Sequence, residues 1–166
     1  MKRILVAGVG NVLLGDDGFG VEVVRRLHRR GLAGAEVRDF GIRGQDLALA
    51  LLDDWRGVVI VDAARRGRAP GTLTVIEPVP GRAAVMLGWH GMDPAAVLAA
   101  VRAMGGSIAR RTVRLLACEP AAVPGDDDDL VMGLSECVAA CVDPACAMVE
   151  ALVRELAAAA EEVERA

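Results

Sequence analysis

A glycine-rich stretch with two acidic residues follows the first apolar segment and is the part of the chain best suited to chemistry. It runs Gly8-Val9-Gly10-Asn11-Val12-Leu13-Leu14-Gly15-Asp16-Asp17-Gly18-Phe19-Gly20. A glycine-rich turn between a strand and a helix usually presents backbone N–H groups to a phosphate, at the positive end of the helix dipole. Asp16 and Asp17 would repel such an anion. Near two later candidates, Asp62 and His90, they would favour a divalent cation, because carboxylate oxygen and imidazole nitrogen suit borderline metals.

Further acids stand where other predicted strands end. Asp39 ends the second predicted strand, Asp62 directly follows the third, and Glu119 follows the fifth. In an open α/β sheet, ligands bind beyond the carboxyl ends of the strands. We therefore expect these acids and Asp17 to share one crevice, where a cation or a proton would relieve a repulsion of roughly 1 kcal/mol or more per close pair. Taken singly, each acid is also explained as a turn former or a helix cap.

The chain has two histidines, and they differ in their surroundings. His90 lies in Leu87-Gly88-Trp89-His90-Gly91-Met92-Asp93, a loop before a predicted helix, from which an imidazole could swing over the crevice. A lone histidine can equally have a purely structural role. His28 stands among arginines at the polar end of the first predicted helix, and we expect it to be exposed to solvent.

The cysteines allow two interpretations. Cys137 and Cys141 would lie about one helical turn apart and could hold a soft metal, with Cys146 nearby. Free cysteines are more often small buried hydrophobic residues, and this predicted helix has no partner histidine. Cys118 completes the set. The absence of a Cys-x-x-Cys pair fits a reduced compartment, so the expected location is cytoplasmic.

Apolar runs alternate with amphipathic stretches and predict a β-α-β-α-β order. The predicted strands are 4–7, 36–40, 57–61, 72–76 and 112–117, and the predicted helices are 19–30, 45–52, 94–104, a short helix capped by Ser135, and a closing helix launched by Asp143-Pro144 that runs to about 162. The connection before 72–76 is shorter than a parallel crossover needs, so this strand is placed antiparallel at an edge. The predicted fold class is α/β, a three-layer sandwich with a mostly parallel five-stranded sheet, one antiparallel edge strand and helices on both faces.

Composition excludes several classes of protein. The 166 residues predict a single domain, 1–166, with a core of aliphatic residues, because there are two Phe, two Trp and no Tyr. Few aromatic residues and a net charge of −4 argue against a nucleic-acid partner. No stretch offers the roughly 20 apolar residues of a membrane span. The apolar run after Met1-Lys2-Arg3 is broken by glycines, so it predicts a buried strand rather than a secretory signal.

Together these residues resemble the nickel–iron hydrogenase maturation endopeptidases. The resemblance rests on the ordered set Gly8-Val9-Gly10-Asn11-x-x-x-Gly15-Asp16-Asp17-Gly18-x-Gly20, Asp39-Phe40-Gly41-Ile42-Arg43-Gly44, Val61-Asp62-Ala63, Pro70-Gly71-Thr72, His90, Glu119-Pro120 and Gly133-Leu134-Ser135. It extends from Lys2 to the closing helix. Some members carry Glu in place of Asp17, and many have Gly and Thr where this chain has Phe40 and Ile42.

The resemblance implies a carboxylate- and metal-dependent protease that removes the C-terminal extension of a hydrogenase large-subunit precursor after nickel insertion. By motif match, Asp17, Asp62 and His90 would be the nickel ligands, and Asp39 would be the catalytic acid. Nickel would arrive with the substrate, so no permanently bound cofactor is expected. The expected partner is the large-subunit precursor, and a monomer with no membrane attachment is expected.

Two other functions stay open on the sequence. A non-enzymatic nucleotide-binding module is suggested by Gly8-x-Gly10, although Leu13 occupies the position of the third glycine of that fingerprint. A hydrolase of small molecules with a resident metal would use the same acids. If nickel in the substrate is instead the signal for cleavage, precise positioning of the nickel-loaded precursor lowers the activation barrier of peptide hydrolysis. The ion or a carboxylate such as Asp39 would then activate water or polarise the scissile carbonyl.

Overall fold

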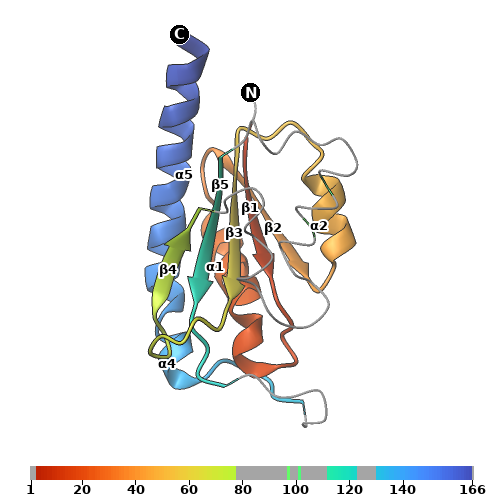
Figure 1. Ribbon diagram of the computed structural model, residues 1–166, viewed down its shortest axis with the longest axis vertical. Helices are drawn as coiled ribbons and strands as arrows, with labels where there is room; N and C mark the ends of the chain where they lie inside the picture. The colour runs from red at the N-terminus through yellow and green to blue at the C-terminus, as the bar shows by residue number, and fades with distance from the viewer. Residues whose placement is uncertain (1–2, 78–96, 98–100, 102–111, 123–129, 166) are drawn as a thin grey trace.

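A five-stranded sheet forms the centre of the protein, in a computed structural model that describes residues 3–77, 97, 101, 112–122 and 130–165. The strands are β1 (Ile4–Val9), β2 (Ala35–Gly41), β3 (Gly57–Ala63), β4 (Leu73–Ile76) and β5 (Thr112–Cys118). Their spatial order is β2-β1-β3-β5-β4; β4 alone runs antiparallel to its neighbour (Figure 1). The predicted mostly parallel sheet with one antiparallel edge strand is confirmed.

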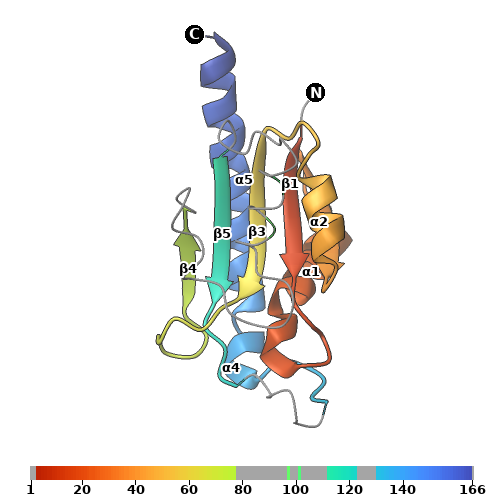
Figure 2. The same ribbon diagram turned by 45° about the vertical axis from the view of Figure 1, so that its right-hand side comes forward.

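Helices cover both faces of this sheet and make three layers. The helices are α1 (Phe19–Arg30), α2 (Gly44–Ala50), α4 (Glu136–Ala139) and α5 (Val142–Arg165). Figure 2 shows α1 and α5 on one side of the sheet and α2 on the other. The three-layer α/β sandwich predicted from the sequence is confirmed.

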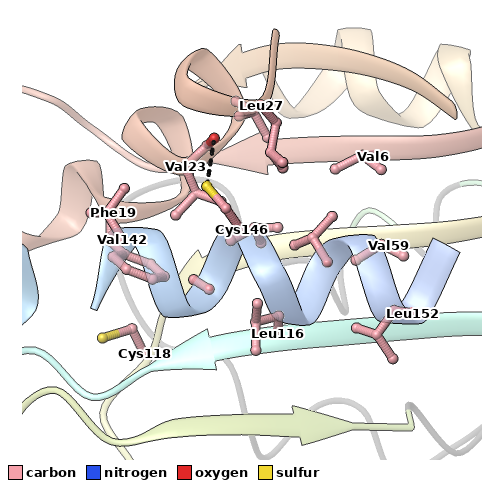
Figure 3. Packing of buried hydrophobic residues seen from close by; sticks show 14 of the residues in the cluster. Val6, Phe19, Val23, Leu27, Val59, Leu116, Cys118, Val142, Cys146 and Leu152 are labelled. Atoms are coloured by element: carbon pink, nitrogen blue, oxygen red, sulfur yellow. Dashed lines mark hydrogen bonds between the residues drawn. The ribbon is translucent and has the colours of Figure 1, made fainter. Parts of the chain in front are cut away.

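The face under α1 and α5 is built by residues that alternate along the strands. Val59 and Val61 of β3 point to this side, where Val23 of α1 and Val149 of α5 pack against them. Figure 3 shows Cys146 among these side chains, with its Sγ 3.8 Å from the backbone oxygen of Val23. Burial of so many aliphatic side chains supplies the main driving force for docking α5, at about 25 cal/mol per Å² of apolar surface.

The opposite face holds the alternate residues of the same strands. Val58 and Ile60 of β3 pack here with Leu47 of α2 and with Trp55. Trp55 donates a hydrogen bond of 2.6 Å from Nε1 to the backbone oxygen of Ala50, so its one polar atom is satisfied in the core. Because β3 contributes to both faces, its whole length is buried.

This second face also receives part of the predicted helix 94–104. Val97 and Val101 are helical, buried and part of the α2-side core, as predicted. The other residues of that predicted helix lie outside the described part of the chain.

Of the two predicted helix caps near the C-terminus, Ser135 stands at the predicted N-cap position and Asp143 does not. Asp143 was expected to cap the closing helix, but α5 already begins at Val142, and the Asp143 carboxylate instead accepts hydrogen bonds from Arg26 and Arg30 of α1. Ser135 is the N-cap of α4 without a side-chain cap bond. Its hydroxyl donates to Asp16 at 2.9 Å. In both cases a distant partner outcompetes the local cap.

Within the described residues, none of the helices combines the length and the apolar character that crossing a lipid bilayer requires.

Candidate functional site at the carboxyl edge of the sheet

A 3₁₀ turn, η1 (Gly15–Gly18), follows β1 and carries Asp17 into the start of α1. Gly10 makes this path possible: its φ is +129°, and a Cβ there would lie 1.9 Å from the backbone oxygen of Asp17. Asp17 is 6% exposed, and its Oδ2 accepts a 2.7 Å hydrogen bond from the backbone N–H of Asn11. The loop after β1 therefore wraps around a buried carboxylate.

Asp62 lies at the end of β3, directly beside this turn. The residue is 9% exposed, and Oδ1 accepts a 2.8 Å hydrogen bond from the backbone N–H of Ala63. A Cβ on Gly20 would lie 2.1 Å from the backbone oxygen of Val61. The start of α1 thus rests directly on the end of β3, since only a glycine fits there. Asp17 precedes Gly20 by three residues and Asp62 follows Val61 directly, so the backbone contact places both acids near this corner of the sheet edge.

Asp39 lies at the same edge but on the other face. Asp39 lies two residues after Val37 and therefore on the same face, which packs under α1. Asp62 lies two residues after Ile60, which packs on the α2 side. The Nε of Arg25, on α1, donates to Asp39 Oδ2 at 3.2 Å, and the Asp39 side chain is 33% exposed. The alternation of side chains along the strands directs Asp39 and Asp62 to opposite faces of the sheet, so the prediction that both line one crevice beyond the strand ends stays a prediction.

Glu119 is a structural carboxylate. The backbone N–H of Arg66 donates to both of its oxygens, at 3.0 and 2.8 Å, and that of Gly67 donates at 3.2 Å. These bonds fasten the loop between β3 and β4 to the end of β5. The bland interpretation of Glu119, as an acid that fastens a loop, therefore has direct support, whereas its contribution to a shared crevice stays a prediction.

Asp16 is structural as well, although it adjoins Asp17 in the sequence. It is 2% exposed and accepts hydrogen bonds from the backbone N–H of Ser135 at 2.6 Å, from the Ser135 hydroxyl, and from the N–H groups of Ala121 and Ala122 at 2.8 and 3.3 Å. Three segments far apart in the chain meet on this one side chain. Sequence reasoning missed the division of labour between Asp16 and Asp17, since the donors lie more than a hundred residues away.

His90 lies outside the described residues, so its predicted place in the site stays a prediction. Among the residues described, no group of three or more His, Cys, Asp or Glu side chains could hold a metal ion. The other histidine, His28, is exposed at the end of α1, as predicted.

The four cysteines are free thiols, and two are buried. Burial first, and then the neighbouring Cys141 and Asp16, raise the pKa of Cys118 to about 12. Burial also raises the pKa of Cys146. The interpretation of Cys137, Cys141 and Cys146 as small buried hydrophobic residues is confirmed for Cys146 and wrong for Cys137. Cys137 is exposed, and Cys141 donates from Sγ to the backbone oxygen of Gly71 at 3.0 Å.

An α/β sandwich with buried carboxylates at the carboxyl edge of its parallel strands has the arrangement of an enzyme that binds its substrate there. A profile of the family described as hydrogenase maturation protease matches residues 21–152. Hydrogenase 2 maturation protease of Escherichia coli K12 is 32% identical over 158 residues, which cover 92% of each chain. The chain belongs to the hydrogenase maturation protease family.

Other relatives are similar in sequence over shorter stretches of the chain. A putative hydrogenase maturation protease of Methanocaldococcus jannaschii is 42% identical over 78 residues, and the hydrogenase expression/formation protein HupD of Rhodobacter capsulatus is 36% identical over 124. The matches span 51% and 58% of the length of these two proteins, and 46% and 72% of this chain.

Solved structures of related proteins superpose on nearly the whole chain. The hydrogenase maturating endopeptidase HybD of E. coli superposes with a TM-score of 0.77 at 31% identity and 93% coverage of both chains. The maturation protease HybD of Thermococcus kodakarensis gives a TM-score of 0.74 at 25% identity, covering 92% of this chain and 99% of its own.

Proposed function

We propose that this protein is an endopeptidase that removes the C-terminal extension of a nickel–iron hydrogenase large-subunit precursor once nickel has been inserted. Two independent lines support the proposal. The chain belongs to a family of hydrogenase maturation proteases. It also buries two acids, Asp17 and Asp62, at the sheet edge where α/β enzymes bind their substrates.

The buried pair Asp17 and Asp62 is the observation that carries the proposal. A cation brought by the substrate would interact favourably with two carboxylates that are held at low exposure. Nickel that arrives with the precursor would bring this positive charge, together with ligands from the precursor itself. Only a loaded substrate would then be held firmly, so the presence of the metal becomes the specificity check.

His90 is the third proposed ligand. It precedes Val97 by seven residues in the sequence, and Val97 packs on the α2 side of the sheet, the face to which the alternation along β3 directs Asp62. Two carboxylates and one imidazole form a borderline donor set that suits nickel. A neutral imidazole is needed for binding, so processing should fall at low pH as the histidine is protonated.

Asp39 is the proposed catalytic acid, and its position indicates which part of the site it can reach. A Cβ on Gly41 would lie 3.6 Å from Asp39 Oδ1 and 3.8 Å from the backbone oxygen of Gly10. Asp39 therefore borders the glycine loop that leads to Asp17, from the α1 side. This favours a role in activating water or in orienting the peptide at the rim, with the metal bound on the α2 side.

The proposal is tested by incubating nickel-loaded precursor with the wild-type protein and with D62A and H90A, and by measuring the mass of the large subunit. We expect shortening by the wild type and none by the two variants, with circular dichroism showing an intact fold. Shortening by D62A at the wild-type rate would overturn the assignment of the site.

Two cheap measurements separate the competing functions. Tight binding of NADH in a fluorescence titration would support a nucleotide-binding module. A stoichiometric metal in protein purified without chelator would support a hydrolase with a resident ion.

A further inference from the structure

The strand β2 interrupts its pairing with β1 at Asp39. Asp39 pairs with Gly8 of β1, but Gly41 pairs with the very next residue of β1. Phe40 is therefore an extra residue in β2, which makes this point a β-bulge. A bulge bends its strand and re-aims a neighbouring side chain, and bulges are frequent next to active sites. The direction of the Asp39 side chain thus depends on contacts beyond the regular ladder.

Arg25 of α1 supplies such a contact. Its Nε donates a hydrogen bond of 3.2 Å to Oδ2 of Asp39. The two side chains are 49% and 33% exposed, so the ion pair lies at the rim of the molecule rather than in the core. Because solvent screens an exposed pair, it contributes little to the free energy of unfolding. The main consequence of the contact is the orientation of the Asp39 carboxylate.

The two oxygens of this carboxylate face different neighbours. Oδ2 faces Arg25, whereas Oδ1 lies beside Gly41, where a Cβ would be 3.6 Å from it. The same Cβ position is 3.8 Å from the backbone oxygen of Gly10, in the loop that leads to Asp17. The N–H of Gly10 also donates to the oxygen of Gly41 at 3.0 Å. With Oδ2 held by Arg25, Oδ1 is the oxygen on the side of the glycine loop.

Open space adjoins the pair on both sides. Arg25 and Asp39 line a cavity of about 340 Å³ between α1 and β2. Arg25 also lines a second cavity, of about 370 Å³, which extends to η1. The backbone of Asp39 is held separately, because Arg43 donates to its carbonyl oxygen. Packing therefore leaves the carboxylate room to rotate on a fixed backbone, and the bond from Arg25 is what directs it.

We propose that Arg25 is the positioning residue for Asp39, and that by holding Oδ2 it presents Oδ1 to the substrate at the glycine loop. The inference rests on the proposed function and deepens it, since Asp39 is the proposed catalytic acid. Activating water and orienting the peptide both require one oxygen at a fixed place. Misplacement of a catalytic group by about 1 Å can cost about 100-fold in rate. Arg25 thus affects cleavage only through Asp39.

The test is a double-mutant cycle on cleavage of nickel-loaded precursor by the wild type, R25A, D39N and R25A/D39N. We expect R25A to lower kcat about tenfold and to leave KM within about twofold, because positioning acts on the bound substrate. In the D39N background, R25A should change kcat by less than about twofold, since the carboxylate that Arg25 orients is already gone. An equal loss in both backgrounds would overturn the proposal, as would an unchanged kcat in R25A. So would a rise in KM that persists in D39N, because Arg25 would then contact the substrate itself.

Arg29 provides the matched control. It lies one turn further along α1, lines the same cavity and is 63% exposed, but it faces Glu22 at 3.7 Å. R29A removes the same charge from the same helix and should keep the kcat and KM of the wild type. R25K should retain more activity than R25A, because a lysine ammonium can replace a single hydrogen bond from Nε. Equal losses in R25A, R25K and R29A would contradict the proposal by showing a general effect of charge.

NMR of the free protein tests the contact without any precursor. Exchange of the Arg25 Nε–H with water should be faster in D39A than in the wild type, because the variant lacks the acceptor. Arg43 is the internal control, since its Nε lies 3.1 Å from Asp46 and its exchange should be the same in both proteins. Unchanged exchange at Arg25 would overturn the proposal whatever the kinetics.

These outcomes are separable from failure of the proposed function. If the wild type does not shorten the precursor at all, the proposed function fails, and the NMR measurement still decides whether Arg25 holds Asp39. If the wild type shortens the precursor and R25A has the same effect with and without D39N, only the positioning role of Arg25 fails.

Discussion

The two faces of the sheet end differently at the carboxyl edge, although both are apolar along most of their length. On the α1 side the last acid, Asp39, is one third exposed and paired with Arg25. On the α2 side the last acid, Asp62, is buried at the end of a strand that is buried throughout. An exposed ion pair contributes about 0–1 kcal/mol and needs no special explanation. Burying a carboxylate costs more than exposing one, so the two acids differ in how far their surroundings have been adapted to hold a charge.

The largest expected effect is the loss of activity on replacing Asp62, compared with the loss on replacing Asp39. Asp62→Asn keeps the shape of the side chain but removes the charge that attracts the ion, and we expect a loss of about 1000-fold in kcat/KM, equivalent to about 4 kcal/mol. Asp39→Asn should lose less, about 10- to 100-fold, because Asp39 does not share the face of Asp62. The rate of shortening of nickel-loaded precursor measures both. Equal losses would remove the distinction between the faces.

The neighbouring acids Asp16 and Asp17 should differ in the same way, one affecting stability and the other cleavage. Asp16→Ala removes the acceptor shared by Ala121, Ala122 and Ser135, which come from two distant segments, and we expect the free energy of unfolding to fall by about 3 kcal/mol. Asp17→Asn should change the free energy of unfolding less than Asp16→Ala while abolishing cleavage. Urea denaturation gives both free energies. A smaller loss of stability in Asp16→Ala than in Asp17→Asn would reverse the assigned roles.

The reactivity of the cysteine thiols measures how well the core under α1 excludes water. The raised pKa of Cys118, about 12 because of burial, keeps this thiol protonated at pH 8. Cys137 is exposed. We expect Cys137 to react with Ellman's reagent at least 100-fold faster than Cys118 and Cys146, and C137S to lose that fast phase. Fast labelling of the buried thiols in the native protein would show that this face opens readily.

The smallest expected effect concerns the ion pairs between α1 and α5. The hydrogen bond from Arg30, opposed in part by desolvation and aided by Arg26, lowers the pKa of Asp143 below 3.8. A carboxyl group with a lowered folded-state pKa contributes stability above its unfolded pKa and loses it as the pH falls through the folded value. An NMR titration should show the lowered pKa, and R30A should return it towards 3.8. An unchanged value in R30A would mean that this contact does not persist in solution.

Most of the fold could be predicted because it depends on local patterns. The apolar run 57–61 lies within β3, and the shortness of the connection before 72–76 correctly placed β4 at the edge. Burial of both faces needs only continuous apolar strands and amphipathic helices, which the sequence displays directly.

The site could be predicted only in part, because its details depend on distant partners. The role of Asp16 requires Ser135 and Ala121 to arrive from other segments, which no local pattern around residue 16 announces. The separation of Asp39 from Asp62 follows from the alternation of side chains, but only once it is known which alternate set packs under α1.

The most direct test of the central claim is the ratio of cleavage rates for nickel-loaded and nickel-free precursor under identical conditions. If Asp17, Asp62 and His90 read the ion, the wild-type protein should shorten the loaded form at least 100-fold faster. Asp62→Asn should bring the rate on the loaded form down to that on the nickel-free form. Equal shortening of both forms by the wild type would contradict the account.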